Sequence, residues 1–525
     1  MTYLSRSIIQ GTQDNGTIAN VPVTAEGHLE VAIHGPRLPF GSIHTESLTP
    51  VFQTDAVYGL NALTTVATVG INSGGVSSAT VTGTGNVFRC STGTTVASFA
   101  TLQSRKRLRY RAGQGIVGRF AGGFSGAVAN AILVAGFGTA ESGFYFGYNG
   151  TTFGILYVTG GVREVRTLTI TTASTATNNY NVVLDSATAV NVTATNNGST
   201  ARTAYEIAQG TYPGWDAYSI GSTVVFIAGA VGLKSGTFSL AQAGAGTPAA
   251  GTYAQTLAGA PSDDTWIPQT TWNGDKLDGT GPSGFTIDPT KGNVYQIGVQ
   301  YLGFGTITFS VEVVGEGNNA DFVTVHTIKF PNTSTTTSIT QPSFPFTMAA
   351  YSAGSTTNAS VFAGSFAGFI EGPKFLHGPR MTYTDTSTTV STGAYYALMT
   401  IRNDRVYAGR ANQSVVNLLS FGGAHDDATP VTLYLLKNAT LVGTPNFQPW
   451  ATGSCTSVDT GATTATVADN NQIMFSVPIG ASGTALTSFE DEVTLQPGDS
   501  ITIAATAVTG TSTYTIASLN TREDQ

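Results

Sequence analysis

The chain has few charged residues and many threonines, and this combination restricts its fold more than any other feature of the sequence. Asp, Glu, Lys and Arg make up 10% of the residues, whereas roughly 25% is usual for a soluble domain. Long solvent-facing helices draw on Glu, Lys and Arg. Threonine suits a pleated strand instead, because its branched side chain packs there while its hydroxyl bonds water. The sequence therefore predicts an all-β protein.

The length and the aromatic content favour a folded protein with several domains. A chain of 525 residues is longer than one hydrophobic core usually organises. Its 63 glycines and 20 prolines are spread along the sequence, as many tight turns between short strands require. A polar, glycine-rich chain can also be disordered, but aromatic residues make up 10% of this one. They supply more surface for burial than disordered segments carry.

The charge balance and the chain start exclude several classes of partner. The net charge of −8 gives no general attraction to nucleic acid or to anionic membranes. The first residues, MTYLSRSIIQGTQDNG, lack the pattern of a secretory signal peptide, and no apolar run is long enough to span a bilayer. We therefore expect synthesis in the cytoplasm, no nucleic acid partner and no membrane insertion. Cys90 and Cys455 lack metal-ligand spacing and could form at most one disulfide.

Changes in the pattern of apolar and turn-forming residues along the chain suggest how the domains are arranged. Residues 1–50 are interrupted by prolines that block helices, and they predict an extended N-terminal anchoring arm. Short apolar runs separated by Gly and Asn turns predict strands in 51–165, and the same texture resumes in 283–373. We infer that these two segments are the first and second parts of one β-sandwich. Two separate domains are the alternative.

The remaining segments are an insertion and a second sandwich. Residues 166–282 predict a small β-β-α-β module followed by a low-complexity connector from residue 241 onward. We expect this inserted α+β module to interrupt the first sandwich. Residues 374–525 contain apolar strands at regular spacing, which predicts a C-terminal jelly-roll-like β-sandwich.

One helix is predicted, in the segment STARTAYEIAQGTYPGW of the inserted module. Ser199 or Thr200 can cap its first turn, and Gly210 with Pro213 ends it. Its narrow apolar side consists of Ala204, Ile207 and Ala208.

The sharpest charged feature is the alternating segment SRKRLRYR, in which four arginines occupy every second position. In a strand they project from one face. Arginine offers bidentate hydrogen bonds to carboxylate, sulfate and phosphate, so this face could bind an anionic glycan or phosphate. The alternative, which we favour, is a subunit interface where acidic groups of a neighbouring copy compensate the charges. The arginines are Arg105, Arg107, Arg109 and Arg111, and the candidate acids are Glu141, Glu164 and Glu312.

Two tryptophans lie close enough in the sequence to suggest a platform for sugar rings. Trp266 and Trp272 follow the low-complexity connector. Exposed indole rings could stack on a glycan, but tryptophans are equally expected as anchors of a hydrophobic core. Glycan stacking by this pair is therefore one hypothesis, and core packing is the other.

Motifs for catalysis are weak. A glycoside hydrolase needs two carboxylates roughly 5–10 Å apart. The acidic groups here stand in Gly-, Ser-, Thr- or Pro-rich turns, where solvated turn residues are the usual interpretation. The histidines lack HxH and HExxH spacing, and no GxSxG motif occurs. We expect no enzymatic activity, no metal and no cofactor. The acidic groups are Asp263 with Asp264, Asp275 with Asp278, Asp426 with Asp427, and Glu490 with Asp491 and Glu492.

Several phrases of the sequence, in order, resemble virion structural proteins of environmental tailed bacteriophages and some algal viruses. They include EGHLEVAIHGPRLPFGSIHTESLTPVFQTDAVYG, SRKRLRYRAGQG, VYQIGVQYLGFGTITFSVEV and PGDSITIAATAVTGTSTYTIASLNTRED. The resemblance covers residues 20–525. Members of this group are described as tail-fibre-like or capsid-associated, so the resemblance implies no catalytic residues. It does imply an interrupted jelly-roll-like sandwich and an N-terminal anchoring arm.

These observations predict a structural protein on the surface of a virus particle, made in the host cytoplasm. We expect a homo-oligomer, a trimer by preference, that contacts other virion proteins through residues 1–50. Its role would be a tail fibre, baseplate or receptor-binding appendage that can contact a host cell-surface glycan. A capsid decoration or head-fibre protein is the alternative, and a polysaccharide depolymerase is a further one from a different class.

Overall fold

The computed structural model describes the chain in two units, Met1–Ser47 and Leu48–Gln525. In the first unit, β1 (Gln10–Thr12) and β2 (Ile18–Asn20) pair antiparallel. The rest of the predicted anchoring arm up to residue 47 lies outside the described residues. The described residues are 10–12, 18–20, 48–71, 76–111, 113–195, 198–242, 249–300, 302–314, 320–373, 378–385 and 388–524.

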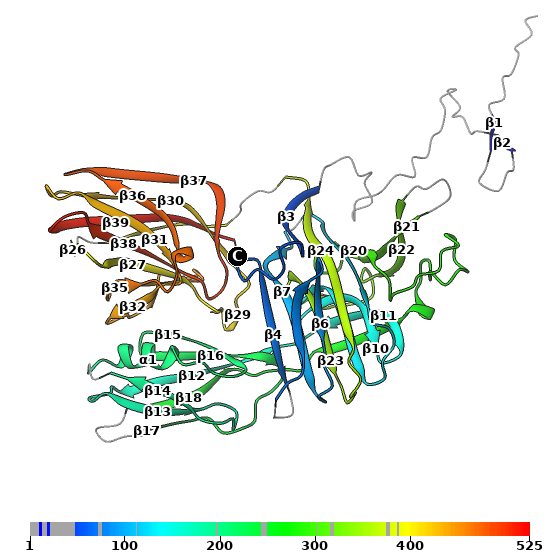
Figure 1. The fold of residues 1–525 in the computed structure, drawn as a ribbon, viewed down its shortest axis with the longest axis horizontal. Coiled ribbons are helices and arrows are strands. Elements are labelled where there is room, and N and C mark those ends of the chain that lie inside the picture. The colour runs from blue at the N-terminus through cyan, green and yellow to red at the C-terminus, as the bar shows by residue number, and fades with distance from the viewer. Residues whose placement is uncertain are drawn as a thin grey trace, which may run out of the picture. The chain divides into compact units, whose positions relative to one another are not determined.

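Within Leu48–Gln525 the regular structure is almost entirely antiparallel β-sheet, which confirms the all-β prediction. The first sandwich has two sheets (Figure 1). One runs in the order β19 (Asp263–Pro268), β11 (Thr152–Thr159), β10 (Gly143–Asn149), β9 (Ala131–Gly138), β23 (Ser343–Ser352), β7 (Ser98–Arg109) and β4 (Thr65–Ile71).

The second sheet of this sandwich also combines strands from distant parts of the chain. It runs in the order β22 (Ala320–Ile328), β21 (Ile307–Val314), β20 (Asn293–Val299), β8 (Ile116–Phe124), β24 (Ser360–Glu371), β6 (Val87–Ser91) and β5 (Thr80–Thr84). β3 (Leu48–Asp55) pairs with β24, so residues 48–50 belong to the sandwich. In Figure 1 the yellow-green strands β23 and β24 lie among blue and cyan strands from the first part of the chain.

The core between these sheets is mostly aromatic. Phe346 on β23 stacks on Phe366 on β24, with ring centroids 4.1 Å apart. Glycine makes room for such rings, since a Cβ on Gly118 would lie 2.2 Å from the Phe137 ring of the facing sheet. Glycine in these strands therefore serves packing as well as turns.

The inserted module has more strands than the predicted β-β-α-β unit. One sheet runs β15 (Trp215–Ile220), β16 (Thr223–Val231), β12 (Arg163–Thr172) and β18 (Ala250–Leu257), and the other runs β14 (Val190–Ala194), β13 (Asn178–Val183) and β17 (Ser239–Gln242). The segment YNVVLDSATAVNVTATNN, which would be the second strand of the predicted unit, instead forms the β13–β14 hairpin. It folds back at Asp185 and Ser186, which both have positive φ. Their left-handed backbone lets the chain reverse direction there.

The predicted helix is confirmed. The helix α1 spans Thr200–Ala208, and the Ser199 side chain accepts a hydrogen bond from the main-chain N–H of Arg202. Ala204, Ile207 and Ala208 are buried in the core of the module. The serine cap and the spacing of these three apolar residues were sufficient to predict this helix from the sequence.

The low-complexity connector predicted for residues 241–282 is wrong over most of the part that the structure describes. β18 pairs with β12 along most of its length. β19 pairs with β11, so residues from Asp263 onward belong to the first sandwich. β18 lies at the edge of its sheet, and its Thr252, Tyr253 and Thr256 are residues that favour strands despite the small residues around them.

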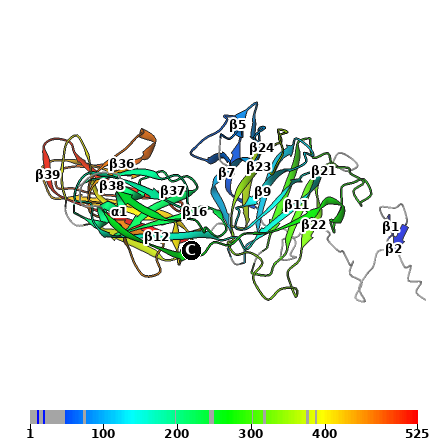
Figure 2. The ribbon, with the colours of Figure 1, turned by 90° about the horizontal axis from the view of Figure 1, so that it is seen from below.

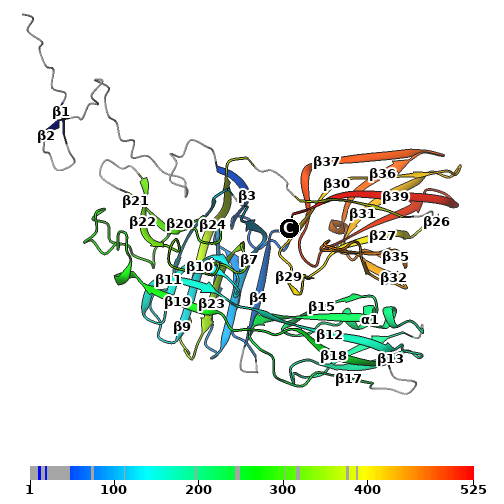
Figure 3. The same cartoon turned by 180° about the vertical axis from the view of Figure 1, so that it is seen from behind.

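The C-terminal part of the chain is a second β-sandwich with a separate core (Figure 3). One sheet runs β25 (Arg380–Thr384), β39 (Thr511–Asp524), β30 (Val415–His425) and β37 (Thr484–Leu495), and β26 (Thr388–Ser391) pairs with β39. The other runs β32 (Thr440–Gly443), β35 (Ala462–Thr466), β27 (Tyr395–Asn403), β38 (Ser500–Ala507), β31 (Val431–Lys437) and β36 (Ile473–Ile479). β33 (Gln448–Pro449) and β34 (Thr456–Asp459) extend it, and β28 (Val406–Tyr407) pairs with β29 (Arg410–Ala411).

Candidate functional site

The four arginines of the alternating segment lie at the end of β7, on the face directed away from the sandwich core. The residues between them explain this orientation, because Leu108 and Tyr110 are buried in the opposite direction. A bulge opposite Phe346 interrupts the pairing of β7 with β23. The alternation breaks beside it, because Lys106 is exposed like its neighbour Arg105.

The partners of these arginines belong to the same chain. Arg111 Nη2 lies 2.7 Å from Asp524 Oδ2. Arg109 donates to the main-chain oxygen of Asp524, and Arg107 Nη1 donates to Gln413 Oε1 at 2.7 Å. The last described residue of β39 is therefore joined to β7 by a buried ion pair.

Arg109 and Arg111 thus have partners within their own chain, and the predicted acids lie near other arginines, while a subunit interface at this face stays a prediction. Glu141 lies 3.3 Å from Arg163, and Glu164 lies 2.5 Å from Arg166. Glu312 acts electrostatically on Arg119. Each of these acids thus lies close to an arginine that does not belong to the alternating segment.

A buried arginine connects the C-terminal sandwich with the inserted module. Arg402 on β27 donates to Asp404 Oδ1 at 2.8 Å and to the main-chain oxygen of Ser219 on β15 at 2.7 Å. Its guanidinium also lies over two rings, 4.9 Å from the centroid of Tyr218 and 3.9 Å from that of Phe447. The charge is therefore held by a carboxylate, a carbonyl and two aromatic faces.

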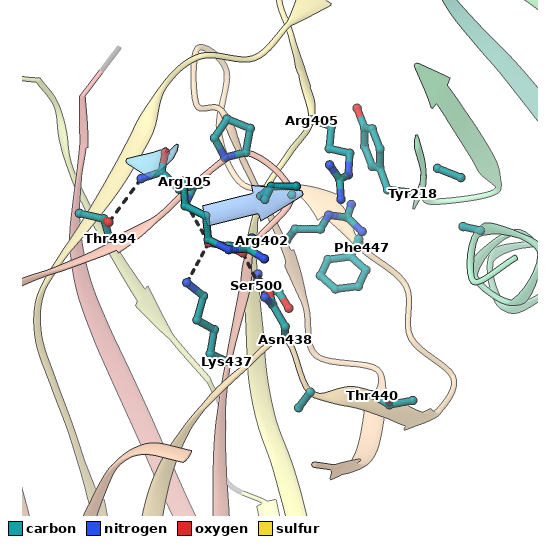
Figure 4. Close-up of a pocket in the computed structure, with 18 of the residues that line it drawn as sticks. Arg105, Tyr218, Arg402, Arg405, Lys437, Asn438, Thr440, Phe447, Thr494 and Ser500 are labelled. Atoms are coloured by element: carbon teal, nitrogen blue, oxygen red, sulfur yellow. Dashed lines mark hydrogen bonds and ion pairs between the residues drawn. The ribbon is translucent and has the colours of Figure 1, made fainter. Parts of the chain in front are cut away.

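A cavity of about 620 Å³ lies beside this arginine. It is lined by β7, by the end of α1 and β15, and by loops of the C-terminal sandwich (Figure 4). The sequence pointed to an anion site at Arg105 and Arg107, but not to the other walls of the cavity, because their residues come from segments hundreds of positions away. Its basic residues are Arg105, Lys106, Arg107, Arg402, Arg405 and Lys437.

The predicted tryptophan platform does not form. Trp272 is 2% exposed and packs edge to face against Phe146 and Phe153 in the core of the first sandwich. Trp266 on β19 is only partly buried. With one indole inside the core, the pair offers no common surface to a sugar, and core packing is the correct interpretation for Trp272.

The acidic groups considered for hydrolysis organise turns where their side chains are described. Asp278 accepts hydrogen bonds from the N–H and hydroxyl of Thr280. Asp427 accepts from the N–H and hydroxyl of Thr513. Asp263 and Asp264 are exposed on β19. The side chains of Glu490, Asp491 and Glu492 lie outside the described ones.

Asp275 holds the loop that follows Trp272, and its replacement gives a pH-dependent prediction. Its carboxylate accepts from the N–H groups of Leu277 at 2.9 Å and Ser283 at 2.7 Å. Burial raises the pKa of Asp275, but the hydrogen bonds from Ser283 and Leu277 outweigh it and leave the pKa below its usual value. This stabilisation is present above the unfolded pKa of about 3.9 and is lost as pH falls through the folded value.

We therefore expect Asp275→Ala to lower the free energy of unfolding of the first sandwich by about 1–3 kcal/mol at neutral pH. The difference from the wild-type chain should shrink as pH falls below the unfolded pKa of about 3.9 and disappear only below the lowered folded pKa, where the native carboxylate is protonated. Urea unfolding at both pH values measures it. The matched control is Asp264→Ala, at an exposed carboxylate, which should change stability by less than about 0.5 kcal/mol. Equal losses at the two pH values contradict the role of the ionised group.

Cys90 and Cys455 are both free and buried, so the single disulfide left open by the sequence does not form. Burial raises the pKa of the Cys90 thiol to about 12. Within the described residues, no group of three or more His, Cys, Asp or Glu side chains is placed to hold a metal ion. A search of the same residues finds no helix with the length and apolarity needed to cross a membrane.

Comparison with known proteins adds no family. No family model matches the chain, and no curated protein matches it either. Any function must therefore be argued from the residues themselves.

Proposed function

We propose that the chain is a non-enzymatic structural protein on the outside of a virus particle. In this proposal it forms a homo-oligomer, preferably a trimer, in a tail fibre, baseplate or receptor-binding appendage of a tailed phage. The resemblance of several sequence phrases to virion structural proteins supports this role. The all-β architecture with few charges is compatible with it, because β-sheets satisfy main-chain polar groups without relying on surface charge.

The observation that carries the proposal is an exposed apolar edge on the first sandwich. β4 is the last strand of its sheet, and the sequence TVATVGI contains neither charge nor proline. Its neighbour β5 ends the other sheet, so both edges lie on the same side (Figure 2). Large apolar side chains gather here, with Tyr58 96% exposed. The exposed side chains are Val57, Tyr58, Leu60, Leu63, Val66, Val69 and Val76.

Such an edge favours contact with another copy of the chain. Monomeric proteins protect edge strands with lysine, proline or a covering segment, because free N–H and C=O groups can pair with another strand. β4 contains neither lysine nor proline. A strand edge offers both donors and acceptors, and because a trimer needs a heterologous contact, β4 of one copy would meet a different edge, such as β5, of the next copy. Clustered apolar side chains then supply the burial that stabilises the contact.

The substitution Val69→Lys is expected to disrupt self-association. Val69 is 52% exposed in the middle of β4, and a lysine there would place an unpaired charge in an apolar interface. We expect the full chain to be trimeric at micromolar concentration and the variant to dissociate at least about 100-fold more readily, a change of roughly 3 kcal/mol. Mass photometry over a dilution series measures this.

The matched control is Val508→Lys, which adds the same charge at an apolar side chain that is 59% exposed in the C-terminal sandwich. This control should remain oligomeric. A wild-type chain that is monomeric throughout the dilution series contradicts the proposal.

Location is tested on the particle itself. Antibodies against the purified chain, viewed by electron microscopy on intact particles, should label the tail or baseplate. Labelling spread over the capsid would favour the capsid decoration or head-fibre alternative. Release of oligosaccharides from host capsule or lipopolysaccharide by the purified chain would favour a depolymerase instead.

A further inference from the structure

The cavity beside Arg402 has a charge opposite to that of the chain. Among the described residues, six lysines and arginines line it, but Asp499 is the one acidic residue that does. The chain as a whole carries a net charge of −8. Figure 4 shows Arg105, Arg402 and Lys437 close together around this space. Its volume, about 620 Å³, lies within the range of roughly 300–1,000 Å³ typical of ligand sites.

Three of the six cations already have carboxylate partners. Arg402 is paired with Asp404, which is buried next to it. The ammonium of Lys437 lies 2.9 Å from Asp499, and Arg405 lies 3.4 Å from Asp216 on the module. These three pairs build the walls of the cavity.

The other three cations, all from β7, have no carboxylate within ion-pair distance among the described residues. Arg105 donates from Nε to the carbonyl oxygen of Ala62, and Arg107 to the amide of Gln413. Arg105 and Lys106 are exposed. Burial and then the charge of Arg163 lower the pKa of Arg107 to about 10, and the more distant charge of Glu141 offsets this only in part. An anion next to these groups would supply an opposite charge that no ion pair gives them among the described residues.

The rest of the lining decides between classes of anion. The aromatic residues Tyr205, Tyr218 and Phe447 are 7%, 6% and 3% exposed, and Arg402 occupies a face of the last two. They leave no open ring on which a nucleobase could stack, as nucleotide sites usually require. Side-chain amides and hydroxyls line the remaining wall and suit sugar hydroxyls. These residues are Asn438, Thr440, Thr494, Gln496 and Ser500.

We propose that this cavity binds a short segment of an acidic polysaccharide, with Arg105, Lys106 and Arg107 holding its carboxylate or sulfate groups. The inference extends the proposed role from self-association to ligand recognition. The cavity shares two lining residues, Leu63 and Val66, with the exposed edge at β4, but the cations that would hold the saccharide lie on β7.

Isothermal titration calorimetry with the full chain tests this inference. The probes are a heparin-derived hexasaccharide, an oligogalacturonate of the same length, a neutral maltohexaose and inorganic phosphate. We expect at least one acidic saccharide to bind, with an affinity that falls as sodium chloride is added. The double substitution Arg105→Gln with Lys106→Gln should weaken this binding about 100-fold, since each charge-assisted hydrogen bond contributes about 1.5–3 kcal/mol.

The matched control is Lys291→Gln with Lys329→Gln, which removes the same charge from exposed lysines of the first sandwich outside the cavity. It should bind as the wild-type chain does. Unchanged binding by the Arg105 and Lys106 variant, equal binding of maltohexaose, or binding of phosphate as tight as that of the saccharides overturns the inference. The same titration on Val69→Lys separates the two proposals, because saccharide binding should persist when self-association is lost.

Discussion

The substitution Arg402→Met is expected to destabilise the chain by about 3–5 kcal/mol, as removal of one partner of a buried ion pair does. Arg402 is 8% exposed, and Asp404 beside it is 6% exposed. Methionine can fill the space between Tyr218 and Phe447, but it leaves the Asp404 carboxylate with only the hydroxyl of Ser457 as a hydrogen-bond donor. The loss of the positive charge next to Asp404, and not a loss of side-chain volume, causes most of this destabilisation.

This loss should depend on pH. Burial is the largest influence on Asp404 and raises its pKa even with Arg402 present. A carboxyl with a raised folded pKa contributes fully below its unfolded pKa, and this contribution is lost as pH rises through the folded value. The Arg402→Met deficit should therefore grow from about pH 4 toward neutral pH. Differential scanning calorimetry across this range measures it.

Rescue by a second substitution makes this prediction specific. Asp404→Asn removes the charge that Arg402→Met leaves unpaired, so the double variant should be more stable than Arg402→Met alone. Arg402→Lys should fall between the wild type and Arg402→Met, because lysine keeps the charge but cannot match the planar contacts. A deficit that is independent of pH and is not rescued by Asp404→Asn would show that packing dominates instead.

The second large effect is expected at the contact between β7 and β39. Asp524→Asn leaves the Arg111 guanidinium without its carboxylate, and the side chains of this pair are only 13% and 11% exposed. We expect a loss of about 3–5 kcal/mol. Hydrogen exchange should increase at the end of β39 and at the end of β7, because the two sandwiches are joined there.

Arg111→Met tests the same contact from the other side and should cost about as much. The double variant Arg111→Met with Asp524→Leu should recover part of the loss, since no charge then remains unpaired. Val442→Lys, at an exposed position far from this contact in the sequence, serves as the surface control. Exchange that stays unchanged at both strand ends in Asp524→Asn contradicts a joining role for the pair.

Local patterns predicted local structure well in this chain. The serine cap and apolar spacing gave the helix α1, and the alternating segment was correctly expected to form a strand, since β7 contains three of its arginines. Both signals act within a few residues, where the period of the backbone decides which side chains share a face. The all-β class followed from composition for the same reason, because strand and helix preferences are properties of single residues.

Partners across long sequence distances could not be predicted. Asp524 pairs with an arginine 413 positions earlier, and no local pattern marks it as the acid that β7 needs. Trp272 stands in a polar, glycine-rich segment, which suggested exposure, but it completes a core built from β10 and β11. The basic cavity depends on three segments that meet only in the folded chain. The Asp524 ion pair, the burial of Trp272 and the basic cavity all depend on contacts between residues far apart in the sequence. No short stretch of sequence predicts such contacts.

The register between β11 and β19 has a consequence for how such chains can diversify. Thr159, where the chain leaves the first sandwich, is the pairing partner of Asp263, where it returns. The inserted segment thus occupies the place of a hairpin turn, and a few residues could close the same ladder. An exchange of the segment between related genes would leave the host sandwich with its strand order intact. The adjustments would fall on the contacts of the inserted segment with the C-terminal sandwich, such as the Ser219 carbonyl that receives Arg402 and the N–H of Gly221 that donates to the Phe447 carbonyl.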